Sequence, residues 1–229
     1  AGPMARIIGL EAWQIGATVT IAGVAWMLMA RVWGGYSDRK GRRPVILFGL
    51  AGFSLSYFLL ALIVDMALQK QMLPVVAFIA LVVVRGVVGL FYAAVPTTNA
   101  ALVADHVVPE KRAAALAAIG ASSAAGMVIG PGFAGLIGPF SLSLPLYLAA
   151  VLPPIALLVL SRVLPKLEKH AKADGETLRL TDVRLRRPMI IAFVAAFCVA
   201  VAQITVGFFA LDRLRLDPAS VARTAGMAL

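Results

Sequence analysis

Six long apolar stretches constrain the fold of this chain more than any other feature of its sequence. They occupy residues 12–34, 44–64, 74–94, 113–138, 142–164 and 188–211, and a seventh begins near residue 218. Each is about as long as the roughly 20 mainly apolar residues that a helix needs to cross a bilayer. Backbone polar groups must be paired internally in lipid, so such stretches predict helices. The predicted fold class is all-α, a polytopic membrane helix bundle with about six full transmembrane helices and the start of another.

The composition requires the same environment. Hydrophobic residues make up 61% of the chain, whereas soluble domains contain about 45–50% on a similar count. An excess of this size cannot be buried inside one compact core. We therefore predict that the lipid bilayer is a partner of the chain.

The basic residues are interpreted as topology signals. The net charge is +10, and the Lys and Arg residues cluster between apolar stretches, at 39–43, 111–112 and 165–187. Clusters of this kind hold loops on the cytoplasmic side of a membrane. The first stretch is therefore predicted to run from outside to inside, which implies an earlier span in a longer protein. No nucleic-acid partner is expected.

Several classes of chemistry find no support in the sequence. With Cys198 as the single cysteine, no disulfide can form within the chain, and no metal-ligand spacing is present. The apolar stretches contain no Ser/His pair, no paired aspartates and no His-rich zinc pattern. We therefore predict no catalytic residue, no metal site and no cofactor, and the sequence argues against an enzyme.

The connection between the first two stretches carries the most specific motif, GGYSDRKGRRP at residues 34–44. Its first two glycines are predicted to permit close helix approach, and Gly41 to take the positive φ of a tight turn. The motif resembles the signature G-x-x-x-D-R-x-G-R-R/K of the major facilitator superfamily, between its second and third helices. The matching residues are Gly34, Asp38, Arg39, Gly41, Arg42 and Arg43. A plain cytoplasmic loop is the alternative, but it does not require an aspartate and glycines at these offsets.

Arg85 lies in the middle of the third apolar stretch. An Arg at that depth costs a few kcal/mol, so it normally faces a cavity or a partner. Helical spacing places four further residues on its face, which we predict to line a central cavity: Gly89, Tyr92, Pro96 and Asn99. The segment resembles the fourth-helix motif of the same superfamily, which has been linked to proton coupling, although Val88 replaces its Gln. A structural Arg paired to a neighbouring helix is the alternative.

The fourth stretch contains GMVIGPGFAG at residues 126–135. This resembles the fifth-helix signature G-x-x-x-G-P-x-x-G-G of superfamily antiporters, with Ala134 in place of one glycine. The matching residues are Gly126, Gly130, Pro131 and Gly135. Small residues also recur every four positions from Ala114 to Gly130, a pattern that predicts close approach of two helices. The resemblance favours export over uptake.

Two further polar sites remain open to alternatives. The stretch from Asp105 to Arg112 resembles one that superfamily members often carry between helices four and five. Both residues are predicted to join Asp38 and Arg42 in a cytoplasmic charge network, and a solvated loop is an equal alternative. Gln203, in the sixth stretch, is assigned to the substrate cavity, with a bond to another helix as an equal alternative.

The resemblance covers nearly the whole chain, as helices two to seven and the start of eight. It implies that residues 1–164 form an incomplete N-terminal six-helix bundle, that 165–187 form a cytoplasmic linker, and that 188–229 begin a C-terminal bundle. No convincing internal repeat is visible.

The resemblance also implies a function. The expected activity is that of a secondary active transporter, a monomeric proton-coupled exporter of small amphiphilic or drug-like molecules in a bacterial inner membrane. Arg85, Asp38 and Asp105 would take part in transport and proton coupling. A metabolite uptake symporter or facilitator is the alternative within the family, and a receptor or channel without coupled transport is the alternative outside it.

Overall fold

A computed structural model describes residues 7–137, 141 and 143–164, with seven isolated helical positions between 190 and 201. Its helices are α2 (Ala12–Lys40), α3 (Arg42–Leu68), α4 (Pro74–Tyr92), α5 (Ala94–His106), α6 (Pro109–Ile137) and α7 (Leu144–Val163). The described ranges contain helices and no strand, which confirms the predicted all-α class. Most of the predicted span at 188–211, the span beginning near 218 and the linker at 165–187 lie outside the described residues.

Five described segments are long and apolar enough to cross a bilayer. They correspond to the first five predicted stretches, but two extend further than expected. α2 continues through the signature motif to Lys40, and α4 and α5 together form one segment of 33 residues, Pro74–His106. Pro96 does not end the helix there because it lies in the first turn of α5, where its missing N–H is not needed.

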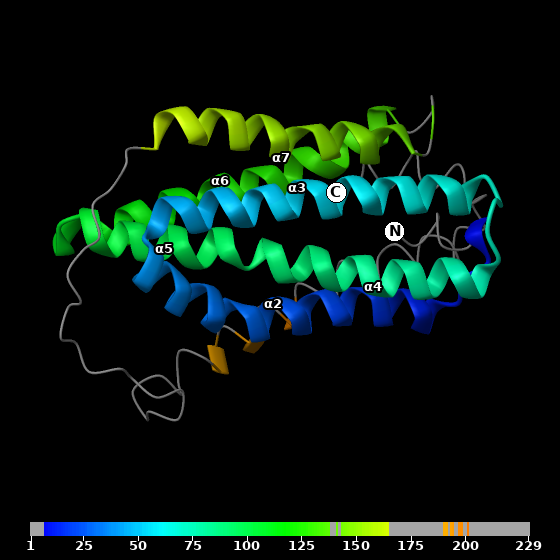
Figure 1. Cartoon of the computed structure of the whole chain (residues 1–229), viewed down its shortest axis with the longest axis horizontal. Helices are drawn as coiled ribbons and strands as arrows, with labels where there is room; N and C mark the ends of the chain where they lie inside the picture. Colours follow the sequence, from blue (N-terminus) through cyan, green and yellow to red (C-terminus); the bar gives the residue numbers. More distant parts are fainter. Residues whose placement is uncertain are drawn as a thin grey trace.

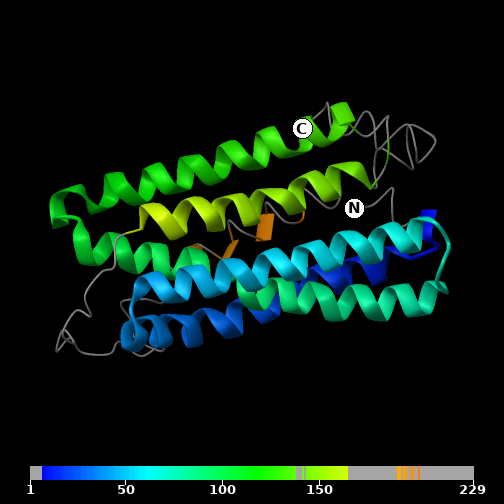
Figure 2. The same cartoon turned by 45° about the horizontal axis from the view of Figure 1, so that its top comes forward.

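The helices run lengthwise in one bundle with α4 between α2 and α3 (Figure 1). α3 also packs against α7, whereas α6 contacts α5 and α7 along much shorter interfaces. Figure 2 shows α6 at the edge of the bundle farthest from α2. The described core is therefore α2, α3, α4 and α5, with α7 attached through α3.

Glycines allow the close contacts within this core. A Cβ on Gly89 of α4 would collide with the backbone carbonyl of Ala22 on α2. Gly49 and Gly52 on α3 leave room in the same way for Ala94 and for the ring of Phe91. Small residues at helix interfaces let backbones approach in lipid, where burial of apolar surface gives little driving force. These three glycines were not identified from the sequence as packing positions for α3 and α4.

The glycines that the sequence did single out for close approach do not serve it in the described residues. A Cβ on Gly34, Gly35, Gly126 or Gly130 would meet no atom within 4 Å. The prediction of close helix approach at these positions was therefore wrong for the described part of the chain. The spacing of small residues indicates that one face of the helix is smooth. It does not predict whether a second helix packs against that face.

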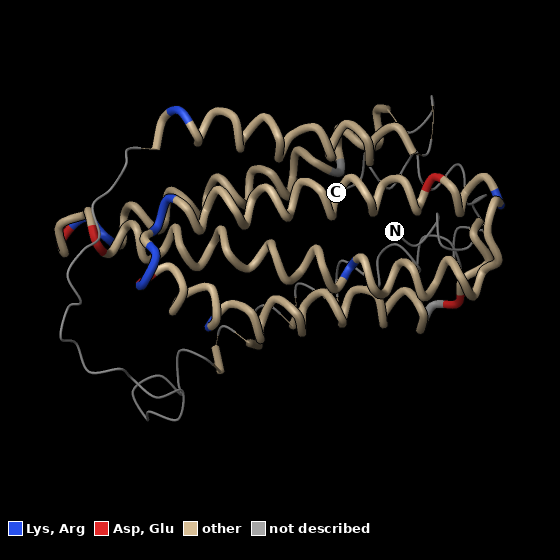
Figure 3. The backbone as a smooth tube through the Cα atoms, in the orientation of Figure 1, with Lys and Arg blue, Asp and Glu red and all other residues tan. Residues whose placement is uncertain are grey.

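Charged residues gather at the two ends of the bundle (Figure 3). Arg42 at the start of α3 is bonded to Asp105 near the end of α5, and Arg43 to Ser161 near the end of α7. The connections after α2 and α5 and the end of α7 therefore meet at one end of the bundle. This confirms the predicted shared end for the basic connections at 39–43 and 111–112, whereas the connection at 165–187 lies outside the described residues.

Candidate functional site

The signature motif forms a tight junction between α2 and α3. α2 ends at Lys40 and α3 begins at Arg42, with Gly41 alone between them. Gly41 has φ +94°, a backbone conformation that residues with a side chain rarely adopt. Its N–H donates to the Ser37 carbonyl at 3.0 Å. The predicted positive φ is confirmed. The junction directs the Arg42 side chain back over the last turn of α2.

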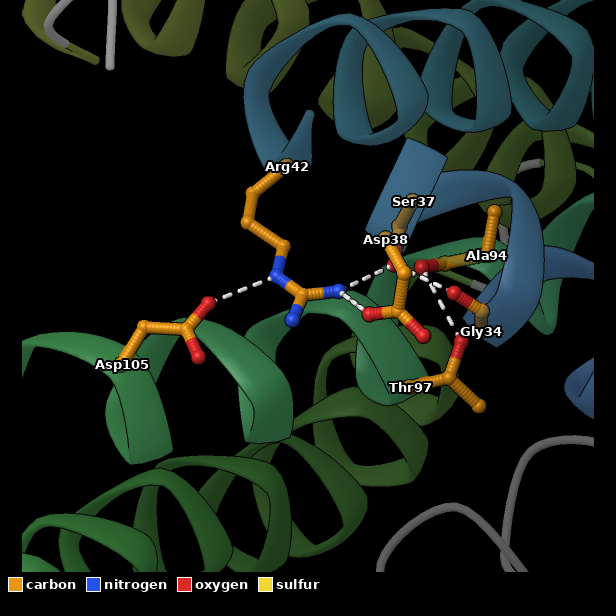
Figure 4. A network of polar contacts seen from close by, with 7 residues as sticks. All are labelled: Gly34, Ser37, Asp38, Arg42, Ala94, Thr97 and Asp105. Atoms are coloured by element: carbon orange, nitrogen blue, oxygen red, sulfur yellow. Dashed lines mark hydrogen bonds and ion pairs between the residues drawn. The ribbon is translucent and has the colours of Figure 1, made fainter. Parts of the chain in front are cut away.

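Arg42 joins three helices at this junction (Figure 4). Its Nε donates to Asp105 Oδ2 of α5 at 2.8 Å, and one terminal nitrogen donates to Ser37 Oγ at 2.6 Å and to Asp38. The side chain of Asp105 is 24% exposed and that of Asp38 63%. The more exposed pair is the weaker contributor, because water and salt screen it. The arrangement brings together Asp38, Arg42 and Asp105 as the sequence predicted.

Two members of the predicted network behave differently. The Arg112 Nε donates to the Val107 carbonyl at 2.9 Å and makes no ion pair with Asp38 or Asp105 among the described residues. Arg112 lies in the first turn of α6 and folds back on its own connection, so its predicted place in the network was wrong. Ser37, by contrast, was missed. Its hydroxyl accepts from Arg42 and donates to the Gly34 carbonyl at 2.9 Å.

The second arginine of the motif binds a different helix. One terminal nitrogen of Arg43 donates to the Ser161 carbonyl at 2.6 Å, in the last turn of α7. The last carbonyls of a helix have no partner within the helix, so a cation is favourable there. Arg39 lies exposed at the end of α2. The contact of Arg43 carries no sequence signal, because it joins residues far apart in the chain.

A break between α4 and α5 connects the junction to the middle of the bundle. The Trp33 Nε1 of α2 donates to the Leu90 carbonyl at 2.8 Å, and the buried indole contacts the rings of Phe48 and Phe91. Pro96 offers no N–H to the Tyr92 carbonyl, so the helical hydrogen-bond ladder is interrupted at this point. Trp33 therefore fastens α2 to the last turn of α4, directly before the break.

Arg85 borders a cavity of about 670 Å³ between α2, α3, α4, α6 and α7. It is the one charged residue among those that line this cavity, and Thr18 and Tyr57 are the lining residues with polar side chains. The walls are apolar and include Leu60, Leu81 and Phe133. No hydrogen bond or ion pair joins Arg85 to another described residue. The cavity predicted beside Arg85 is therefore present.

None of the four residues predicted to share this cavity with Arg85 lines it, and these are Gly89, Tyr92, Pro96 and Asn99. Gly89 is occupied by its contact with Ala22, and Tyr92 stacks on Phe53 with ring centroids 5.5 Å apart. Asn99 lies on α5, beyond the break at Ala93. The prediction assumed one uninterrupted helix and a single polar face. The break between α4 and α5 means that the helix is interrupted. The packing of α2 against α4 covers part of the face that was predicted to be polar. Gln203 lies outside the described residues.

The glycine motif of α6 meets the cavity at one position. Gly130 lines it together with Phe133 and Ala134, whereas Gly126 does not. α6 remains helical through Pro131, and Gly135 is buried. The part of α6 that borders the cavity therefore lies opposite the helix that carries Arg85, with α7 completing the wall.

Comparison with known proteins agrees with this architecture. The sequence model of the Major Facilitator Superfamily matches residues 1–229. A tetracycline resistance protein, class D, of Salmonella ordonez is 29% identical over 216 residues, covering 90% of this chain and 51% of that protein. Multidrug resistance protein 2 of Bacillus subtilis is 24% identical over 95% of this chain and 54% of its own length. The quinolone resistance protein NorA of Staphylococcus aureus is 24% identical over 96% of this chain and 55% of its own length.

The fold and these matches define an integral protein of the bacterial plasma membrane built as a polytopic helical bundle. The chain belongs to the Major Facilitator Superfamily, a family of membrane transporters. It spans about half the length of the curated relatives it matches.

Proposed function

We propose that the protein is a secondary active transporter that exports small amphiphilic or drug-like molecules in exchange for protons. The observation that carries the proposal is the largely apolar cavity inside the membrane-spanning bundle, with Arg85 as its charged lining residue. Ligand pockets are typically apolar with a few placed polar groups, and about 300–1,000 Å³ in volume. The names of the relatives, which refer to resistance to tetracycline, quinolones and multiple drugs, support the choice of export and of substrate class.

The two polar sites would have separate roles in this activity. The network of Asp38, Arg42 and Asp105 would stabilise one arrangement of α2, α3 and α5, so that its strength biases the balance between transport states. Arg85 would act in proton coupling, because a buried cation lowers the pKa of a carboxyl group brought near it. The small-residue motif of α6 would allow this helix to move against a neighbouring helix during transport. Its residues are Gly126, Gly130, Pro131 and Gly135. Residues 1–164 would form part of the first helical bundle, 165–187 a linker, and 188–229 the start of the second.

Transport by everted membrane vesicles tests this proposal. A proton-coupled exporter should load at least one of two fluorescent amphiphiles, the cation ethidium and the acid dansylglycine, only when the vesicle lumen is acidic, and nigericin should abolish the loading. Vesicles prepared without the protein provide the background. Accumulation at the same rate with and without the gradient, or accumulation driven by the opposite gradient, would contradict a proton-coupled exporter. The second result would favour an uptake symporter.

A further inference from the structure

The cavity beside Arg85 has the chemistry of a site for an anion attached to an apolar body. We propose that it binds amphiphilic acids, with the carboxylate held by the Arg85 guanidinium and the apolar part against the walls. This inference rests on the proposed function, because it names a substrate class for the same cavity. It differs from that function in requiring a negative charge on the ligand.

The first argument is the unbalanced charge of Arg85. A buried charge without a partner is strongly unfavourable, and pairing with hydrogen bonds offsets the cost. No described residue supplies an anion or a hydrogen bond to Arg85, and every other lining residue is uncharged. A carboxylate would match the planar guanidinium with two parallel hydrogen bonds, a geometry that an uncharged carbonyl or a cation cannot reproduce.

The second argument is the placement of the polar groups. Tyr57 of α3 lines the same cavity as Arg85, and its hydroxyl makes no hydrogen bond to a described residue. The Thr18 hydroxyl already donates to the Ile15 carbonyl at 2.8 Å. A carboxylate at Arg85 therefore has one further hydroxyl donor available nearby, from Tyr57. Apart from Thr18, Tyr57 and Arg85, the lining residues are apolar.

The third argument is the position of Arg85 along the bundle. The lining residues of α4 are Leu81 and Arg85, which lie about 10 Å and 16 Å from the start of that helix at Pro74 by helical rise. The residues from α6 and α7 include Phe133, Pro145 and Leu152, and they provide the apolar walls. Of the two α4 residues that line the cavity, Arg85 is therefore the one farther from Pro74. A bound acid would place its charge toward the middle of the bundle and its apolar part toward the Pro74 end.

A matched pair of probes tests this assignment without any variant. Dansylglycine carries a carboxylate, and dansylglycinamide is the same molecule with an uncharged amide. Binding of each to the purified protein in detergent is followed by dansyl fluorescence, with protein-free micelles as background. We expect the acid to bind about tenfold or more tighter than the amide, because hydrogen bonds to charged groups contribute about 1.5–3 kcal/mol.

Variants then assign the preference to Arg85. Arg85→Gln should bind both probes equally, and Arg85→Lys should keep a reduced preference for the acid, because Lys retains the charge but not the fork of donors. Arg31→Gln is the matched control, since Arg31 is exposed on α2 and does not line the cavity. Ala149→Phe, in the cavity wall, should weaken both probes to a similar extent.

The outcomes separate this inference from the proposed function. Equal binding of acid and amide by the unmodified protein would overturn the inference. A preference for the acid that persists in Arg85→Gln would also overturn it. In either case, gradient-dependent dye loading would leave the proposed exporter intact. Selective acid binding without any gradient-dependent transport would support the site and contradict the exporter.

Discussion

Charged side chains are accommodated differently in two regions of this bundle, the signature-motif end and the surroundings of Arg85. At the signature-motif end, Arg42 is bonded to Ser37, Asp38 and Asp105, and α2, α3 and α5 are held together by the same side chain. Around Arg85, by contrast, the helices separate and leave a cavity of about 670 Å³ with one cation in it. The first arginine is bonded to protein groups, and the second has no hydrogen bond or ion pair to a described residue. The comparison distinguishes a structural junction from a binding site within one sequence.

Packing follows the same division. Gly49, Gly52 and Gly89 let α2, α3 and α4 approach until no Cβ would fit. Gly126 and Gly130 on α6 face open space among the described residues. Glycine therefore has two uses in this chain, tight contact in one region and an uncovered face in the other. Substitutions that add side-chain volume should affect the two regions differently.

The largest expected difference comes from a matched pair of glycine substitutions. Gly89→Leu should destabilise the protein by about 3 kcal/mol or more, because the added side chain collides with the Ala22 backbone. Gly126→Leu should change stability by no more than about 0.5 kcal/mol, while reducing transport if α6 must move. Thermal unfolding in detergent, followed by size-exclusion chromatography, measures both. Equal loss of folded protein in the two variants would contradict the conclusion that Gly89 is tightly packed and Gly126 is not.

Substitution of Arg85 tests whether the cavity is functional. Arg85→Ala should lower gradient-driven transport by about 10- to 100-fold, the equivalent of losing one interaction with a charged group. Arg85→Lys should retain partial transport. Initial rates in everted vesicles, corrected for protein amount, give the comparison, with Arg31→Ala as a control. Transport by Arg85→Ala at the unmodified rate would show that the residue is structural.

The two aspartates that contact Arg42 differ in solvent exposure, so their contributions to the junction can be measured separately. Asp105→Asn should weaken the Arg42 junction by about 1–2 kcal/mol, because it removes the charge from a hydrogen bond to Arg42. Asp38→Asn should cost no more than about 1 kcal/mol, since Asp38 is largely exposed. Both variants should be expressed and transport more slowly, with the larger loss in Asp105→Asn. The reverse order would mean that Asp38 acts beyond this contact with Arg42, in another conformational state.

The smallest expected effect concerns the bond from α2 to the break between α4 and α5. Trp33→Phe removes the donor to the Leu90 carbonyl but keeps an aromatic ring, and should cost about 1 kcal/mol. Trp26→Phe is the control, because Trp26 is 43% exposed. A lower unfolding temperature for Trp33→Phe alone is the expected result. No difference between the two variants would show that the ring, rather than the N–H, holds α2 in place.

Sequence reasoning identified the charge network but not its full membership. Asp38, Arg42 and Asp105 were predicted together because the motif offsets and the alternation of basic connections place them at one end of the bundle. Ser37 and the Arg43–Ser161 contact were missed, and Arg112 was wrongly included. Each of these depends on the direction of a side chain at a helix end. Spacing along the chain does not specify that direction.

The sequence by itself determined that the chain is a bundle of membrane-spanning helices, with the basic connections at 39–43 and 111–112 at one end. That information is local, because hydrophobic length and charge act on each segment through the bilayer. The tertiary structure alone decided which face of each helix is covered. Gly89 is a packing residue because the Ala22 backbone lies against it. Arg85, one helical turn earlier on the same helix, lines the cavity instead. Such outcomes depend on residues from different helices, far apart in the sequence, and no segment specifies its partner alone.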